Sequence, residues 1–171
     1  RWMQQLPRSI HLRFNGCSIL LVHGSPTAIN RFVFASTEAS RKRREFTPID
    51  VDVIIGGHSG IPFGQRIGSK YWLNTGVIGM PANDGTQDGW YLLLTAEGPA
   101  LRASWRRLIY PWRESHAAMI AAGLDNGYAQ ALQTGLWPSM DILPPAEKAQ
   151  RGKQLRPKDL IINRRPETAC R

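Results

Sequence analysis

The sequence predicts an α/β protein built around a parallel sheet, and three observations support this fold class. Residues 17–22 and 51–55 are apolar runs of strand length, and the polar, basic residues 37–46 between them suit a solvated surface helix. Strand, helix and strand in this order form the unit of a parallel sheet. After Pro111 the pattern becomes helical, so helices are expected to follow the strands.

The first strand is expected to be part of a hairpin. Residues 10–14 alternate apolar and polar side chains, and Asn15-Gly16 is the preferred two-residue turn into residues 17–22. The spacing of four further strand candidates predicts an antiparallel meander. These candidates lie at residues 65–67, 70–73, 90–95 and 101–107. Residues 74–85 are rich in glycine, which favours a loop close to a ligand.

Composition is typical of a globular protein. The 171 residues allow one domain with a tail, and no apolar run approaches the roughly 18 residues that a membrane span needs. The first residues lack a secretory signal, so we expect a cytoplasmic location and no membrane partner. Cys17 and Cys170 are far apart and predict two separate thiols rather than a disulfide.

The net charge of +9 is unevenly distributed. Residues 151–171 carry +5 of it, from seven basic and two acidic side chains. A basic tail can bind nucleic acid or another acidic partner by releasing counterions, but solvated tails are commonly basic as well. A non-catalytic binding module that uses this tail is therefore the alternative function that the charge leaves open.

Two of the four histidines directly follow a predicted strand. His23 precedes Gly24, and His58 follows Gly57. Because the carboxyl ends of parallel strands meet at one edge, we expect both imidazoles in one site, where they are suitable ligands for Zn, Mn or Fe. Two histidines do not complete a metal site, and no catalytic acid or base is identifiable. The open alternative is that both only satisfy loop hydrogen bonds.

Three segments together resemble the second half of the calcineurin-like metallophosphoesterases, especially the small bacterial phosphodiesterase type. They are Leu-Leu-Val-His-Gly-Ser-Pro at 20–26, Val-Asp-Val-Ile-Ile-Gly-Gly-His-Ser-Gly-Ile-Pro-Phe at 51–63 and Leu-Asn-Thr-Gly-Val-Ile-Gly-Met-Pro at 73–81. The likeness extends over roughly residues 10–135. It implies part of a four-layer α/β/β/α sandwich with mixed sheets and carboxyl-terminal helices, holding two divalent metal ions.

The resemblance also implies roles for particular residues. His23 and His58 would be metal ligands, and Gly24, Gly57, Asn74 and Gly76 would bind substrate or shape the site. The family's second histidine in its Gly-His-x-His motif is replaced by Gly60, so one metal ion of the two is in question. Nothing in the sequence matches the family's amino-terminal metal-binding segments.

The chain is therefore expected to be the carboxyl-terminal portion of a longer phosphoric ester hydrolase. Residues 1–110 would form half of the catalytic domain, residues 111–150 a helical extension packed on it, and residues 151–171 a disordered basic tail. The whole enzyme would hydrolyse a phosphate mono- or diester with a metal-bound hydroxide. The missing amino-terminal half would be its partner. The isolated chain is expected to be inactive, which robust metal-dependent turnover of a generic phosphodiester would contradict.

Overall fold

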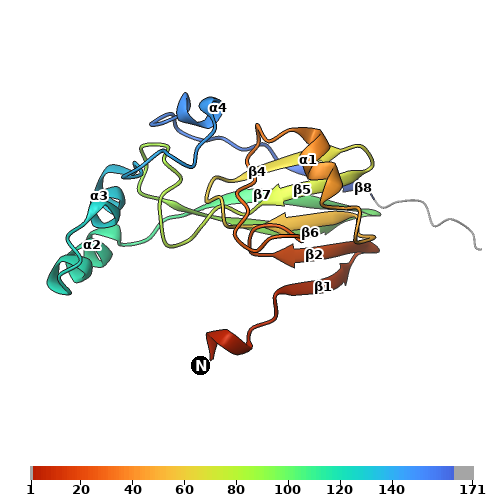
Figure 1. Ribbon diagram of the computed structural model, residues 1–171, viewed down its shortest axis with the longest axis horizontal. Helices are drawn as coiled ribbons and strands as arrows, with labels where there is room; N and C mark the ends of the chain where they lie inside the picture. The colour runs from red at the N-terminus through yellow and green to blue at the C-terminus, as the bar shows by residue number, and fades with distance from the viewer. Residues whose placement is uncertain (1, 164–171) are drawn as a thin grey trace, which may run out of the picture.

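The computed structural model describes residues 2–163 and contains two β-sheets with short helices (Figure 1). The elements in chain order are a 3₁₀ turn Met3–Gln5, β1 Ser9–Phe14, β2 Cys17–Val22, α1 Ala39–Arg44, β3 Val53–Gly56, β4 Phe63–Ile67, β5 Lys70–Asn74, β6 Gly89–Glu97, β7 Ala100–Leu108, α2 Trp112–Ala121, α3 Gly127–Thr134, α4 Pro145–Lys148 and β8 Leu160–Asn163.

The larger sheet has five strands in the order β1, β2, β3, β5, β4. β3 pairs in parallel with both β2 and β5, whereas β1 and β4 pair antiparallel at the two edges. The β1–β2 hairpin turns at Asn15 and Gly16, whose φ angles of 47° and 78° suit a type I′ turn. The predicted hairpin and the predicted strand, helix, strand unit are both confirmed.

The smaller sheet is antiparallel and has the order β6, β7, β8. The prediction of one antiparallel meander is therefore wrong. β4 and β5 form a hairpin in the larger sheet, and β6 and β7 form another in the smaller sheet. Local spacing predicts hairpins, but the sheet that each hairpin joins depends on which of its faces is buried.

Apolar side chains from both sheets fill the space between them. Ile19, Val53 and Leu73 of the larger sheet belong to one core cluster with Leu101 and Trp105 of the smaller sheet. The Trp105 ring crosses Gly64, where an added Cβ would lie 2.2 Å from it, and its indole N–H donates to the Asn74 carbonyl at 2.6 Å. The two sheets thus form the inner layers of a sandwich.

The other face of the larger sheet is covered by α1 and the loops beside it. Leu20, Ile54 and Trp72 pack there with Phe46, and the Phe46 ring meets Trp72 edge to face at 6.1 Å between centroids. The expectation of a wholly solvated basic helix is wrong for Lys42, which is buried. A helix turns by about 100° per residue, so one of four consecutive basic residues must face the sheet.

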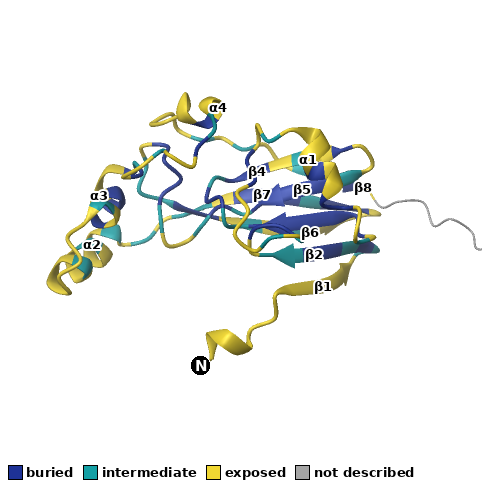
Figure 2. Ribbon diagram, in the orientation of Figure 1, coloured by how far each residue is buried: buried dark blue, intermediate teal, exposed yellow. Residues whose placement is uncertain are grey.

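Residues 2–163 supply three layers of a sandwich: α1, the larger sheet and the smaller sheet. On the outer face of the smaller sheet Tyr91, Leu93 and Ile161 are exposed, so the expected fourth, helical layer is not formed by the described residues. Figure 2 shows the contrast between the dark central strands and the exposed β1 at the edge. The mixed α/β class of the prediction is confirmed.

The helices that follow the strands contact the two sheets unevenly. α2 has no buried residue and packs mainly on α3, away from the sheets (Figure 1). The segment after α3 is anchored by Trp137, whose indole donates to the Pro81 carbonyl at 2.6 Å and whose backbone N–H donates to Asn83 Oδ1 at 2.9 Å. Among residues 2–163 no helix is both long and apolar enough to cross a bilayer.

The expectation of a tail that is disordered from residue 151 is wrong for residues 151–163. Leu155 packs against the core between the sheets, and β8 pairs with β7 through a register that sets Ile162 opposite Leu101. Ile162 is fully buried. The apolar stretch of β8 has only three residues and lies within a basic segment, so it is too short to predict a strand on its own. The rest of the predicted tail, residues 164–171, lies outside the described residues.

Candidate functional site

His23 and His58 lie together at one edge of the larger sheet. His23 directly follows β2, and His58 follows β3 after Gly57. β2 and β3 are parallel neighbours, so their carboxyl ends point to the same edge. The backbone N–H groups of Gly57 and His58 both donate to the His23 carbonyl, at 2.9 and 2.8 Å. The predicted convergence of the two histidines is therefore found.

The two imidazoles approach each other through one nitrogen each. Nδ1 of His58 lies 2.8 Å from Nε2 of His23, and the ring centroids are 4.7 Å apart. In the absence of a cation this contact is a hydrogen bond, with one nitrogen carrying the proton. Two nitrogens that bind one tetrahedral zinc ion at about 2.1 Å lie roughly 3.4 Å apart. The 2.8 Å contact is shorter than that spacing, so the two rings would have to move apart slightly to share one ion.

Electrostatics favour a neutral His58. Partial burial lowers its pKa below the usual value of 6.5, and the nearby charge of His23 lowers it further. A neutral ring offers a lone pair, which is the form that binds a metal ion. His58 therefore does not need to lose a proton near pH 7 before it can act as a ligand.

The donor set is incomplete within the part of the chain that the structure describes. No group of three or more His, Cys, Asp or Glu side chains placed to hold a metal ion occurs there. Two imidazoles fit Zn, Mn or Fe by their chemistry, but a catalytic zinc site has about three protein ligands. Further ligands would have to come from another polypeptide segment.

Gly60 does not stand where a simple replacement by histidine could restore a ligand. Its φ of 68° is in the left-handed region, and an added Cβ would lie 3.1 Å from the Trp137 ring. The carboxyl-terminal segment thus packs against the position at which the resembling family has its second histidine. The glycine at this position thus agrees with the packing of Trp137 against it.

The predicted site-shaping residues divide into two groups. Gly57 and Gly76 line a cavity of about 460 Å³ together with His23 and His58. Asn74 is buried and shapes its wall indirectly, since its Oδ1 accepts from the Gly76 N–H at 2.9 Å and holds the turn after β5. Gly24 lies behind His23, where an added Cβ would be 2.5 Å from the Ile29 carbonyl oxygen. Their assignment to substrate stays a prediction.

Trp90 forms part of the wall of this cavity. It lines the same space, and its ring is almost completely buried. Its indole N–H has no hydrogen-bond partner among residues 2–163. A buried donor without a partner costs free energy, and no atom of residues 2–163 offsets this cost.

Sequence reasoning missed two residues that shape the site, Ser59 and Phe32. Ser59 Oγ donates to the Val33 carbonyl at 2.7 Å and accepts from the Val33 N–H at 2.8 Å, both inside the protein. Phe32 lies with its ring 4.2 Å from the His58 ring, between centroids. The residues preceding α1 have no periodic pattern, so only the adjacency of Ser59 to His58 could have drawn attention to them.

Comparisons with known proteins identify the fold. No family model matches the sequence, and no curated protein matches it. A metallophosphoesterase from Sphaerobacter thermophilus has a similar structure, with a TM-score of 0.66 and 20% identity over 79% of this chain. The hypothetical protein PH1004 from Pyrococcus horikoshii OT3 matches 78% of this chain with a TM-score of 0.68 and 16% identity.

Both solved structures are longer than the matched part. The chain spans 60% of the Sphaerobacter protein and 53% of the Pyrococcus protein. At these identities the likeness concerns the arrangement of the backbone and not the site residues. It agrees with the family resemblance that the sequence segments around His23 and His58 predict. The chain therefore has the fold of the metallophosphoesterases.

Proposed function

We propose that this chain is the carboxyl-terminal part of a metal-dependent phosphoesterase and that His23 and His58 hold one divalent cation. The observation that carries the proposal is the 2.8 Å approach of their two ring nitrogens at the carboxyl edge of a parallel strand pair. Ligand sites of α/β sheets lie at such edges. The cation would be Mn, Fe or Zn, and a second ion would need ligands from outside this chain.

The residues of this chain would support the reaction without acting as its acid or base. A bound divalent cation supplies Lewis-acid polarisation of phosphate oxygens and a lowered pKa for water. His23 and His58, as neutral donors, would fix the position of the cation at the strand ends. Gly57, Gly76 and Trp90 line the cavity beside them, where a phosphate ester would bind.

The proposal includes an amino-terminal half of the same domain, and β1 supports a place for it. The outer edge of β1 is unpaired within the described residues, because β1 is the last strand of its sheet. Ile10, Leu12 and Phe14 lie on the face that carries Cys17 and Ile19, yet they are 52%, 38% and 37% exposed. A partner that extends the smaller sheet would cover them and bring the remaining ligands.

Metal binding to the purified chain tests this proposal without requiring turnover. Isothermal titration with Zn²⁺ or Mn²⁺ is expected to give one site per chain. His23→Ala and His58→Ala should each weaken it by at least tenfold, since each removes one of two protein ligands. His11→Ala is the matched control, because His11 lies exposed in β1. Equal affinity in all three variants would refute the assignment.

A further inference from the structure

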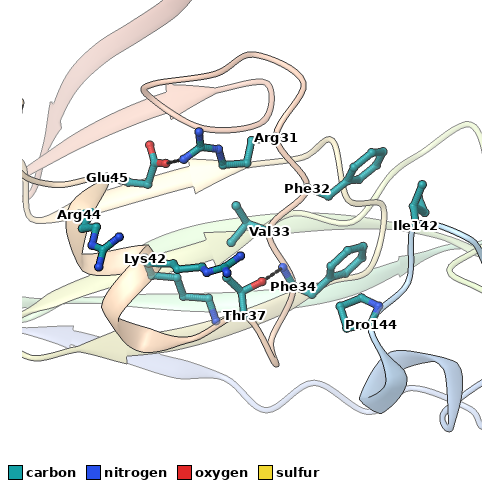
Figure 3. A pocket seen from close by; sticks show the side chains of 11 residues that line it. Arg31, Phe32, Val33, Phe34, Thr37, Lys42, Arg44, Glu45, Ile142 and Pro144 are labelled. Carbon is teal, nitrogen blue, oxygen red and sulfur yellow. Dashed lines mark hydrogen bonds and ion pairs between the residues drawn. The ribbon is translucent and has the colours of Figure 1, made fainter.

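A second cavity of the described structure lies next to the histidine pair and is not explained by it. It measures about 600 Å³ and lies between α1 and the preceding segment 31–34, with Ile142 and Pro144 at its far side (Figure 3). None of the residues that line it also lines the cavity containing His23 and His58. It is therefore a separate space with its own chemistry.

The two ends of this cavity differ in polarity. Figure 3 shows Phe32, Phe34, Ile142 and Pro144 at one end. The other end is formed by α1, which contributes Arg41, Lys42 and Arg44 to the lining. Phe32 and Phe34 lie parallel, with ring centroids 6.1 Å apart and an angle of 4° between the ring planes. An aromatic wall thus faces a cationic wall.

Two of the cations are available to a ligand. Arg31 pairs with Glu45, and the Lys42 ammonium is buried and donates to the Ala35 carbonyl and to the side chain of Gln65. Arg44 has no ion pair within residues 2–163. Arg41 has only an exposed contact of 3.8 Å to Glu38, which is worth little. Arg41 and Arg44 therefore leave an excess of positive charge at this end.

The aromatic end is coupled to the histidine pair. The Phe32 ring is 4.2 Å from the His58 ring on one side and belongs to the cavity wall on the other. Ser59, next to His58, holds Val33 through two buried hydrogen bonds. The segment that carries both phenylalanines is thus fixed directly to the loop that carries His58.

We propose that this cavity binds the nucleoside part of a nucleotide that carries a second phosphate, as in a nucleoside 3′,5′-bisphosphate. The proposal rests on the proposed phosphoesterase function in one respect, namely that the first phosphate lies at the histidine pair. Moving away from the histidine pair, the cavity wall is first aromatic, at Phe32 and Phe34, and then cationic, at Arg41 and Arg44. In such a nucleotide the ribose joins three groups, so that one phosphate would lie at the histidine pair, the base on the aromatic wall and the other phosphate at the arginines.

Each part of such a ligand has a physical reason to bind. A planar base gains contact with the exposed part of Phe32, a residue that is 38% exposed, and with the apolar Ile142. Guanidinium groups bind phosphate through two parallel hydrogen bonds, which a lone ammonium cannot do. A sugar bisphosphate has the same charge but lacks the ring and should bind less well.

The test uses calorimetric titration of the whole chain without added metal. Adenosine 3′,5′-bisphosphate is compared with fructose 1,6-bisphosphate and with inorganic phosphate. The nucleotide is expected to bind at least fivefold more tightly than the sugar bisphosphate, and Phe32→Leu should remove this difference. The double variant Arg41→Ala with Arg44→Ala should weaken nucleotide binding about tenfold, as expected for lost charge-assisted hydrogen bonds. Arg43→Ala, on the same helix but outside the cavity, is the control.

The outcomes separate this inference from the metal site. Equal affinity for the nucleotide and the sugar bisphosphate would overturn the nucleotide assignment. Equal weakening by Arg43→Ala and by the double variant would overturn the cavity as the binding place, since it would indicate a diffuse electrostatic attraction. His23→Ala removes a contact of the first phosphate only, so nucleotide binding that is weakened by this variant but still lost on Arg41→Ala with Arg44→Ala would support the cavity even if metal binding to the histidines failed.

Discussion

At the scale of single residues, the site depends on positions that tolerate only one kind of residue. Gly60 and Gly68 have nearly the same left-handed φ, 68° and 67°, but only Gly60 has a neighbour, the Trp137 ring. An alanine in place of Gly68 would therefore meet only backbone strain, whereas an alanine in place of Gly60 would meet the same strain and the contact with Trp137. His58 is close to this constraint, because only Ser59 separates it from Gly60.

Replacing each glycine by alanine measures these two costs. Gly68→Ala is expected to lower the free energy of unfolding by about 1–2 kcal/mol, which is the price of a Cβ in the left-handed region. Gly60→Ala should cost more, because its Cβ also meets Trp137 at 3.1 Å. Urea unfolding of both variants is the measurement. Equal losses would mean that the Trp137 segment moves aside and that the position is open to a ligand side chain.

At the scale of elements, α1 combines a packing role with a buried charge. Burial lowers the pKa of Lys42 from 10.5 to about 8, and the charge of Glu147 opposes this shift in part. Between pH 8 and pH 10.5 the unfolded chain therefore holds a proton on Lys42 that the folded chain has released. Because the unfolded state binds more protons there, stability attributable to Lys42 rises with pH across this window.

A pH series of unfolding tests this sign. The free energy of unfolding of the natural chain minus that of Lys42→Met is expected to increase from pH 8 to pH 10. Lys148→Met, at an exposed position on α4, controls for the loss of a lysine. A difference that stays constant with pH would show that Lys42 is protonated to the same extent in both states.

The elements that the sequence predicts best are those determined by local pattern. The β1–β2 hairpin, β3, and the positions of α2 and α3 follow from alternation, the Asn15-Gly16 turn and helical spacing. The meeting of His23 and His58 also follows, since it requires only that two strands be parallel neighbours. The family resemblance implies two sheets, but the local pattern could predict neither which hairpin joins which sheet nor the strand β8, because both depend on pairing between residues far apart in the sequence.

At the scale of the whole molecule, residues from the end of the described chain complete the core. Ile162 of β8 is fully buried, whereas its neighbour Ile161 is 40% exposed on the outer face. A part of the basic segment is thus used to close the smaller sheet. The stretch of chain available for the alternative function, a tail that binds nucleic acid, is therefore shorter than predicted.

Alanine variants of Ile161 and Ile162 test whether β8 closes the smaller sheet. Ile162→Ala is expected to lower the free energy of unfolding by about 2–5 kcal/mol, because it leaves a cavity in the core. Ile161→Ala, one residue earlier on the exposed face, should cost less than about 1 kcal/mol. Thermal or urea unfolding gives both values. A similar small loss for both variants would mean that β8 is not docked in solution.

Nitrogen NMR of the histidine rings during a Zn²⁺ titration is the sharpest test of whether His23 and His58 share one cation. We expect Nδ1 of His58 and Nε2 of His23 to shift together and to saturate at one ion per chain, while the rings of His11 and His116 stay unchanged. Independent shifts of the two rings, or shifts at His11 or His116 instead, would contradict it.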